Sequence, residues 1–206
     1  MICTTSLAAA NTTPEEHTTA EGNITHPTVH IVAVHDSELP KGNIIKKTTC
    51  CFTGHRPEKL PDPLSSEGKR IQKELRTAVN EAVQNGFLHF ITGLSRGIDF
   101  DAALYVIEIK KENPDLILEC AIPFEAQSQS WSAADKKIYE YIKSKADINT
   151  VLQKEYTKNC YQKRNEYMVD NSSLLIAVYG GTQSGTKNCI GYARQKSDVK
   201  INMIYC

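Results

Sequence analysis

The chain has 206 residues, of which 40% are hydrophobic and 23% are charged, so we expect one globular domain with a sizeable core. The 24 basic and 24 acidic residues cancel, which removes any general charge-based argument for binding nucleic acid or an acidic membrane. No apolar run approaches 18 residues and the start of the chain lacks the basic residues of a secretory signal, so we expect a cytoplasmic protein with no membrane partner.

The charges are unevenly distributed along the chain. Residues 1–40 hold five acids and no Lys or Arg, so they carry −5, and the rest of the chain carries +5 (24 − 19). A mildly basic domain is compatible with an anionic small ligand. The sequence has no long run of Lys and Arg, so nucleic acid is not expected as a partner.

Seven cysteines are present, an odd number, and no CxxC pair occurs among them. Cys50 and Cys51 are adjacent in an apolar run, and neighbouring strand residues point to opposite faces of a sheet. Neither a disulfide framework nor a zinc site is indicated. We therefore expect reduced, mostly buried thiols and no bound metal.

Residues 1–46 differ in composition from the rest, because they are rich in Thr, Ala and Glu and show no helical period. We interpret them as a disordered or dispensable extension. The apolar run HIVAV at 30–34 is the exception, as a short strand or a docking segment. Residues 47–206 are predicted to form the folded domain.

From residue 47 onwards, apolar strand-like runs alternate with helical patterns. Strands are predicted at residues 48–54, 87–93, 115–124, 148–153, 173–180 and 199–205. Helices are predicted at residues 67–86, 98–113, 134–146, 160–172 and 185–197. Strands that are nearly continuous in apolar residues are typical of a parallel sheet covered on both faces. The sequence thus predicts an α/β, Rossmann-like fold: an open, doubly wound, mostly parallel sheet with helices on both faces.

In such a sheet, ligands bind beyond the carboxyl ends of the strands, near the point where strand order reverses. Four segments follow predicted strands: TGHRPEKLP (53–61), TGLSRGID (92–99), PFEAQSQSW (123–131) and YGGTQSGT (179–186). Glycine lets a ligand approach the main chain, and free N–H groups at the start of the next helix favour a phosphate. The predicted ligand-binding residues are Gly54, His55, Arg56, Gly93, Ser95, Arg96, Gly97, Asp99, Arg164, Gly180, Gly181, Thr182, Ser184, Gly185 and Thr186.

These side chains have different expected roles. The hydroxyls would add hydrogen bonds to a phosphate, and the three arginines would supply paired donors. Asp99 is either a residue of the helix start or an acceptor for a ribose hydroxyl. His55 is either a ligand-facing group or a polar loop residue, and Arg96 suits a carboxylate as well as a phosphate. Trp131 is expected to pack rather than to stack on a base.

Two well-known nucleotide fingerprints are absent from the sequence. No GxGxxG follows the first strand of the domain, and no GxxxxGK[ST] occurs. An ordinary hydride-transfer dehydrogenase and a P-loop NTPase are therefore disfavoured.

Several motifs, in this order, resemble the YpsA-like family of Rossmann-like proteins, in the SLOG superfamily named for SMF/DprA and LOG proteins. They are FTGHRP (52–57), TGLSRGID (92–99), PFEAQSQSW (123–131), RNEYM (164–168) and YGGTQSGT (179–186). The resemblance covers about residues 48–205. It implies a bacterial or phage protein whose glycine-rich loops hold a nucleotide-derived ligand, such as an NAD- or ADP-ribose-type signal. It also implies a homodimer or higher oligomer, and no cofactor is required.

One departure from the LOG pattern bears on activity. LOG enzymes share the sequence pattern RKxxM followed by PGGxGTxxE. Arg164 and Met168 of this sequence fit the RKxxM part. Cys189 falls where the Glu of the second part would lie, and general acid–base work needs a carboxylate. We therefore expect binding, as a sensor or sequestering protein, rather than catalysis.

Two alternatives remain from the sequence. The first is a nucleotide N-glycosidase or phosphoribohydrolase of LOG-like type, for which Arg164, Glu166 and Asp99 are the weak catalytic candidates. The second, and weaker, is single-stranded DNA binding. That mode needs a basic groove with stacking aromatic residues, whereas this domain carries a net charge of only +5, one Trp and no run of Lys and Arg.

Overall fold

The computed structural model describes residues 29–31 and 45–206 of the chain. Its sheet has seven strands in the order β1-β5-β4-β3-β2-β6-β7, and every neighbouring pair is parallel. The strands are β1 (Val29–Ile31), β2 (Thr49–Gly54), β3 (His89–Thr92), β4 (Ile117–Ile122), β5 (Ile148–Val151), β6 (Leu174–Tyr179) and β7 (Lys200–Tyr205). Because they are all parallel, their carboxyl ends meet at one edge of the sheet.

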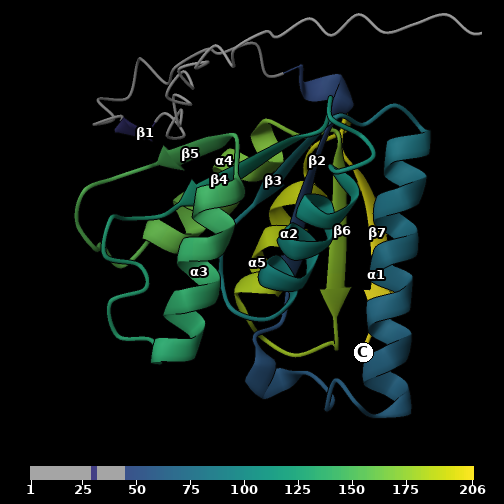
Figure 1. Ribbon diagram of the computed structural model, residues 1–206, viewed down its shortest axis with the longest axis horizontal. Coiled ribbons are helices and arrows are strands. Elements are labelled where there is room, and N and C mark those ends of the chain that lie inside the picture. Colours follow the sequence, from purple (N-terminus) through teal and green to yellow (C-terminus); the bar gives the residue numbers. More distant parts are fainter. Residues whose placement is uncertain (1–28, 32–44) are drawn as a thin grey trace, which may run out of the picture.

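Helices connect the strands and cover both faces of the sheet (Figure 1). They are α1 (Ser66–Gln84), α2 (Ile98–Ile109), α3 (Ala133–Lys145), α4 (Cys160–Asp170) and α5 (Gly185–Ala193), with short 3-10 helices η1 (Lys46–Thr48) and η2 (Pro57–Lys59). The first three α-helices pack on one face, and α4 and α5 pack on the other. The predicted doubly wound, Rossmann-like α/β fold is confirmed.

Side chains of β2 point alternately to the two faces of the sheet, which shows why the sheet needs a helical layer on each face. Cys50 and Phe52 pack in the core cluster that contains the apolar residues of α1, α2 and α3. Cys51, between them, packs in the second cluster with Met168 of α4 and Ile190 of α5. Successive strand residues point to opposite faces, so a strand that is apolar throughout is buried only if both faces are covered.

The predicted elements agree with the structure except at their ends. Ser65 caps α1, because its side chain accepts a hydrogen bond from the Gly68 N–H, and Gly86 follows the helix with a φ of 84°. The helix predicted at 98–113 ends at Ile109, and the chain turns before Pro114. The last helix likewise ends at Ala193, four residues before the predicted end. Helix ends depend on local capping, which periodicity does not encode.

The apolar run near residue 30 supplies β1, which pairs with β5 in the register Val29 to Asn149 and Ile31 to Val151. Residues 32–34 of the predicted run lie outside the described residues, as do 1–28 and the rest of 32–44. The interpretation of residues 1–46 as a disordered or dispensable extension therefore stays a prediction.

Strand order decides where a ligand site belongs. The chain runs outward from β2 through β3 and β4 to β5, and then crosses back to place β6 on the other side of β2. The order reverses between β2 and β6, so the carboxyl ends of these two strands flank the topological switch point. A crevice at this position is the usual ligand site of an open α/β sheet.

Candidate functional site

A cavity of about 320 Å³ lies at the switch point. Its walls come from the segments that follow β2, β3 and β6 and from one face of α4. The lining residues are Thr53, Gly54, His55, Arg56, Glu58, Lys59, Ser95, Asp99, Tyr161, Arg164, Asn165, Met168, Ser184, Gly185 and Thr186. Segments far apart in the sequence are thus brought together because all of them leave the same edge of the sheet.

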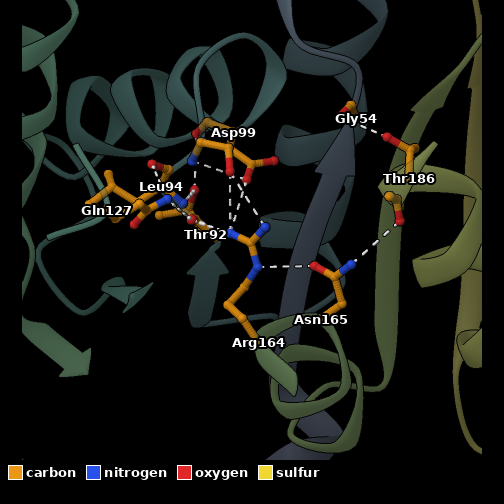
Figure 2. Close-up of polar contacts among 11 residues, drawn as sticks. Gly54, Thr92, Leu94, Asp99, Gln127, Arg164, Asn165 and Thr186 are labelled. Atoms are coloured by element: carbon orange, nitrogen blue, oxygen red, sulfur yellow. Dashed lines mark hydrogen bonds and ion pairs between the residues drawn. The ribbon is translucent and has the colours of Figure 1, made fainter. Parts of the chain in front are cut away.

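Arg164 occupies the centre of the polar contacts at this site (Figure 2). Its guanidinium donates hydrogen bonds to the carbonyl oxygen of Gly93 and, at 3.4 Å, to the hydroxyl of Ser95. Its Nε donates to Oδ1 of Asn165 at 3.0 Å, and Nη1 lies 3.8 Å from Oδ2 of Asp99. Arg164 therefore joins α4 to the loop after β3 and places a buried positive charge beside Asp99.

Asp99 lies in the first turn of α2 with its carboxyl group buried at the cavity. Its Oδ2 accepts a hydrogen bond from the Ser95 N–H at 3.3 Å. Burial raises the pKa of Asp99 to about 6, although the nearby Arg164 guanidinium and the Ser95 N–H act in the opposite direction. At neutral pH the ionised carboxylate can accept a hydrogen bond from a sugar hydroxyl. Below about pH 6 the carboxyl group carries a proton.

The loop from residue 93 to 97 has a constrained backbone. A side chain on Gly93 would collide with the Arg164 guanidinium, and the next residue, Leu94, is fully buried with a φ of 51°. The Leu94 N–H donates to the Thr92 hydroxyl, while Nε2 of Gln127 donates to the carbonyl oxygens of residues 93 and 94. A positive φ in a branched residue costs free energy and persists only where its surroundings hold it. These bonds keep the loop in the shape that presents Ser95 and Asp99 to the cavity.

His55 joins the loops after β2 and β6. The Gly180 N–H donates to Nε2 of His55 at 3.0 Å, so this nitrogen is unprotonated. Burial, assisted by the charge of Lys59, lowers the pKa of His55 and favours that neutral form. Lys59 makes a second link, because Nζ donates to the carbonyl oxygen of Gln183 at 3.2 Å.

The start of α5 forms another wall of the cavity. Ser184 is the N-cap, and its hydroxyl accepts a hydrogen bond from the Lys187 N–H at 3.3 Å. The Thr186 hydroxyl donates to the carbonyl oxygen of Gly54 at 2.9 Å, which fixes the helix start against the end of β2. Gly185 and Thr186 both line the cavity, so the positive end of the helix dipole faces it.

Nine of the predicted ligand-binding residues line the cavity, and six do not. The nine are Gly54, His55, Arg56, Ser95, Asp99, Arg164, Ser184, Gly185 and Thr186. The six are Gly93, Arg96, Gly97, Gly180, Gly181 and Thr182.

Most of those six have identifiable structural tasks. Gly97 begins α2 with a φ of 88°, and a Cβ there would come within 2.5 Å of the His55 carbonyl oxygen. Arg96 does not line the cavity, and it pairs with the carboxylates of Glu58 and, at 3.5 Å, Asp135. Gly180 donates to His55 as described above, which leaves Gly181 and Thr182 farther along the same loop.

The other candidates from the sequence also have clear positions. Glu166 does not line the cavity, and its Oε1 accepts a hydrogen bond from Gln162 one turn earlier on α4. Cys189 is fully buried in the core beneath α5, and burial raises the pKa of its thiol to about 12. Trp131 packs edge-to-face against Phe100 and Tyr139, as expected of a packing residue.

Sequence reasoning predicted only Arg164 on the face of α4 that lines the cavity and missed the other three residues of that face. The four residues are Tyr161, Arg164, Asn165 and Met168. These residues follow the spacing i, i+3, i+4 and i+7, which puts them on one helical face. The helical spacing was visible in the sequence. Because the four residues include both polar and apolar side chains, the pattern did not resemble an apolar face that packs on the core.

Thiols, membrane spans and metal clusters can be assessed for the part of the chain that the structure describes. The six cysteines of this part are unpaired thiols. Within residues 29–31 and 45–206, no helix has the length and apolar character needed to span a membrane. In the same ranges, no three His, Cys, Asp or Glu side chains gather in a way that would hold a metal ion.

The profile of the YpsA family, described as the YspA SLOG family, matches residues 50–205. This chain belongs to the YpsA family of SLOG proteins. The resemblance seen in the sequence motifs is thereby confirmed.

Individual relatives of this YpsA-family chain come from Bacillus. It is 35% identical over 139 residues to the uncharacterized SPbeta prophage-derived protein YoqJ of Bacillus subtilis, which covers 61% of this chain and 81% of YoqJ. It is 29% identical over 133 residues to a UPF0398 protein of Bacillus thuringiensis, which covers 63% of this chain and 72% of that protein.

Solved structures of DNA processing protein A (DprA) are similar in fold. The Streptococcus pneumoniae protein gives a TM-score of 0.50 at 17% identity, over 75% of this chain and 49% of that one. The Helicobacter pylori protein, described for its single-stranded DNA binding mode, gives 0.49 at 16% identity, over 74% and 63%. This chain spans about half the length of the first DprA, and the likeness shows a shared Rossmann-like fold.

Proposed function

We propose that the YpsA-family chain binds a nucleotide-derived small molecule, of the NAD or ADP-ribose type, and senses or sequesters it. The position of the cavity carries this proposal. It lies beyond the carboxyl ends of β2 and β6, where strand order reverses, and the first residues of α5 line it. Open α/β sheets bind their ligands at such a crevice.

The donors around the cavity suit a phosphate group. Gly185 and Thr186 open α5, where backbone N–H groups and the helix dipole favour an anion. Arg56 and Lys59 are exposed side chains that reach the same cavity and add two positive charges. A phosphate at the start of α5 would therefore meet both backbone donors and cations.

The acceptors suit the sugar of a nucleotide. Asp99 is a buried carboxyl group on the cavity wall, held by the Ser95 N–H and Arg164. A carboxylate in such a place can accept the hydrogen bonds of ribose hydroxyls, as an acidic residue does in dinucleotide-binding folds. Binding is favoured over cleavage because Cys189, which replaces the expected carboxylate, is buried in the core and does not reach the cavity.

Isothermal titration calorimetry tests the proposal. The full chain would be titrated with NAD, ADP-ribose, cyclic ADP-ribose isomers, nucleoside monophosphates and a short single-stranded oligodeoxynucleotide, which carries the same bases and phosphates. We expect saturable heat with at least one small nucleotide. Folded protein that gives no heat with any small nucleotide would contradict the proposal, and binding of the oligonucleotide alone would replace it with nucleic-acid binding.

A matched pair of lysine variants places the ligand. Lys59→Ala removes a cavity charge and should weaken nucleotide binding at least about tenfold, the effect of one lost charge-assisted hydrogen bond. Lys111→Ala removes an exposed charge that does not line the cavity and should leave the affinity unchanged. Equal effects of the two variants would indicate general electrostatic attraction instead of a site.

Asp99 supports a second candidate function, cleavage of the N-glycosidic bond of a nucleotide. Its pKa of about 6 would let a carboxyl group at the cavity protonate a leaving base near neutral pH. Release of free base from the nucleotide panel, followed by chromatography and abolished by Asp99→Asn, would establish this activity. Binding without any release of base would leave the sensing function.

A further inference from the structure

Three aromatic rings from separate segments meet beside the cavity. Phe124 follows β4, Tyr156 follows β5 and Tyr161 lies in the first turn of α4. The ring centroid of Phe124 lies 5.4 Å from that of Tyr156 and 6.0 Å from that of Tyr161, with interplanar angles of 76° and 79°. Edge-to-face packing of this kind fixes the orientation of each ring.

The cluster is only partly covered by protein. Phe124 is 8% exposed and forms its buried base, whereas Tyr156 is 61% exposed. Tyr161 is intermediate and lines the cavity. A large aromatic side chain left this open beside a polar cavity has apolar surface available to a ligand.

Arg56 adds a cation to the same place. Its guanidinium carbon lies 5.9 Å from the centroid of the Tyr161 ring, and the exposed Arg56 side chain also lines the cavity. The other two predicted arginines are held by protein groups, Arg96 by Glu58 and Arg164 by Gly93 and Asp99. Arg56 is thus the arginine positioned to stack on a ligand together with an aromatic ring.

The spacing along α4 connects this cluster to the rest of the cavity. Tyr161 and Arg164 are three residues apart, so the two side chains lie on one face of the helix in successive turns. The Arg164 turn faces the Asp99 carboxyl group, which suits a sugar, and the Tyr161 turn carries the partly exposed ring. A ligand that extends along α4 would meet a polar subsite and then an aromatic one.

From this arrangement we propose that Tyr161 and Arg56 form a stacking subsite for the aromatic base of the ligand, with Tyr156 at its rim. The inference rests on the proposed function, because it states which part of a nucleotide is bound where. Stacking on a tyrosine face with a guanidinium nearby accepts any flat heterocycle, since every base has a π-face. The subsite therefore selects for the presence of a base and not for its identity.

Two probes on the full chain test this assignment: ADP-ribose, which has a base, and ribose 5-phosphate, which has none. Tyr161→Leu removes the ring while keeping apolar volume, and should weaken ADP-ribose binding at least about fivefold, since a stacked base contributes about 1–3 kcal/mol. It should leave ribose 5-phosphate binding unchanged. Tyr161→Phe keeps the ring and should keep the affinity for ADP-ribose within about twofold, while Tyr141→Leu, at an exposed ring outside the cavity, serves as the control.

The outcomes separate this inference from the function on which it rests. If the wild type binds ADP-ribose and Tyr161→Leu binds it equally well, or loses both probes equally, the stacking subsite is overturned and nucleotide binding stands. If the wild type binds neither probe but binds another nucleotide of the panel, that nucleotide replaces ADP-ribose in the same test. If it binds no nucleotide of the panel, both proposals are overturned.

A measurement on the wild type avoids dependence on the variant. We expect intermolecular nuclear Overhauser effects between the base protons of bound ADP-ribose and tyrosine ring protons. Binding without such effects would overturn the subsite even if Tyr161→Leu failed to fold.

Discussion

The guanidinium of Arg164 donates a hydrogen bond to the carbonyl oxygen of Gly93, although the two residues are 71 positions apart. This bond ties α4 to the loop after β3, across the switch point of the sheet. The same guanidinium is the cation nearest to the buried Asp99 carboxyl group. The polar side of the cavity therefore depends on one buried side chain.

Replacing Arg164 should destabilise the protein strongly. Arg164→Ala leaves the Asp99 carboxyl group buried without its counter-charge and the Gly93 carbonyl oxygen without this donor, a loss of about 3–5 kcal/mol in the free energy of unfolding. Arg164→Lys keeps the charge but lacks the planar fork that reaches Asn165 and Ser95 together, so we expect an intermediate loss. Urea unfolding at pH 7 measures both, and an Arg164→Ala variant as stable as the wild type would refute the assigned role.

Gly93 and Gly191 make a matched pair for testing the close approach of Arg164. A Cβ at Gly93 would fall on the guanidinium, whereas one at Gly191, inside α5, meets nothing within 4 Å. Gly93→Ala should lower the melting temperature and weaken ligand binding, because it displaces Arg164. Gly191→Ala should raise the stability by about 0.5–1 kcal/mol, because alanine favours the helix. Similar effects of the two substitutions would show that the contact does not restrict residue 93.

His55 predicts a pH dependence of stability on the acid side of neutrality. Its folded pKa lies below the ordinary value of 6.5, chiefly because of burial, so the unfolded chain takes up a proton first as the pH falls. The contribution of His55 is complete above about pH 6.5 and is lost as the pH falls through the lowered pKa. Protonation also removes the acceptor for the Gly180 N–H, so the protection factor of that amide against deuterium exchange should fall over the same range.

A glutamine at position 55 provides the control, since its amide oxygen can accept the Gly180 N–H at any pH. The free energy of unfolding of His55→Gln should change less than that of the wild type between about pH 6.5 and 5. Parallel curves for the two proteins would rule out His55 as the titrating group.

From a buried glutamate outside the cavity we expect a second change in the free energy of unfolding, at a lower pH than that of His55. Glu119 of β4 is 0% exposed and accepts hydrogen bonds from the Thr150 hydroxyl at 2.7 Å and the Tyr167 hydroxyl at 2.6 Å. Its Oε2 lies 2.9 Å from Nε2 of His89. Burial alone would raise the pKa of Glu119, but the hydrogen bonds from His89, Tyr167 and Thr150 outweigh burial and lower it.

The expected effect of Glu119→Gln follows from that lowered pKa. The ionised form contributes stability that is present above about pH 4.5 and is lost as the pH falls through the folded pKa. At pH 7, Glu119→Gln should cost about 1–3 kcal/mol in the free energy of unfolding, because the amide oxygen can still accept from Thr150 and Tyr167 but the amide NH2 group no longer accepts from Nε2 of His89. The gap from the wild type should narrow below about pH 4.5, and a gap independent of pH would show that ionisation of Glu119 does not matter.

The order and type of the elements could be predicted from the sequence, because apolar runs and helical periods are local properties. The runs near residues 50 and 175 are apolar throughout, which required helices on both faces. The glycine-rich segments after β2, β3 and β6 could likewise be assigned to one edge, because parallel strands end together. Eight of the nine predicted residues that line the cavity lie in these segments, and the ninth, Arg164, lies on α4.

The tertiary structure decided what each polar side chain contacts, because a side chain's partners come from distant parts of the chain. Sequence motifs could not show that Arg96 pairs with Glu58 while Arg164 holds Gly93, since both arginines suit a phosphate equally well. They also could not show Tyr161 beside Arg56, because α4 and the segment after β2 are brought together only by the folded sheet. The sequence thus determined the sheet and the edge where a ligand belongs, and folding determined which residues remain available to bind it.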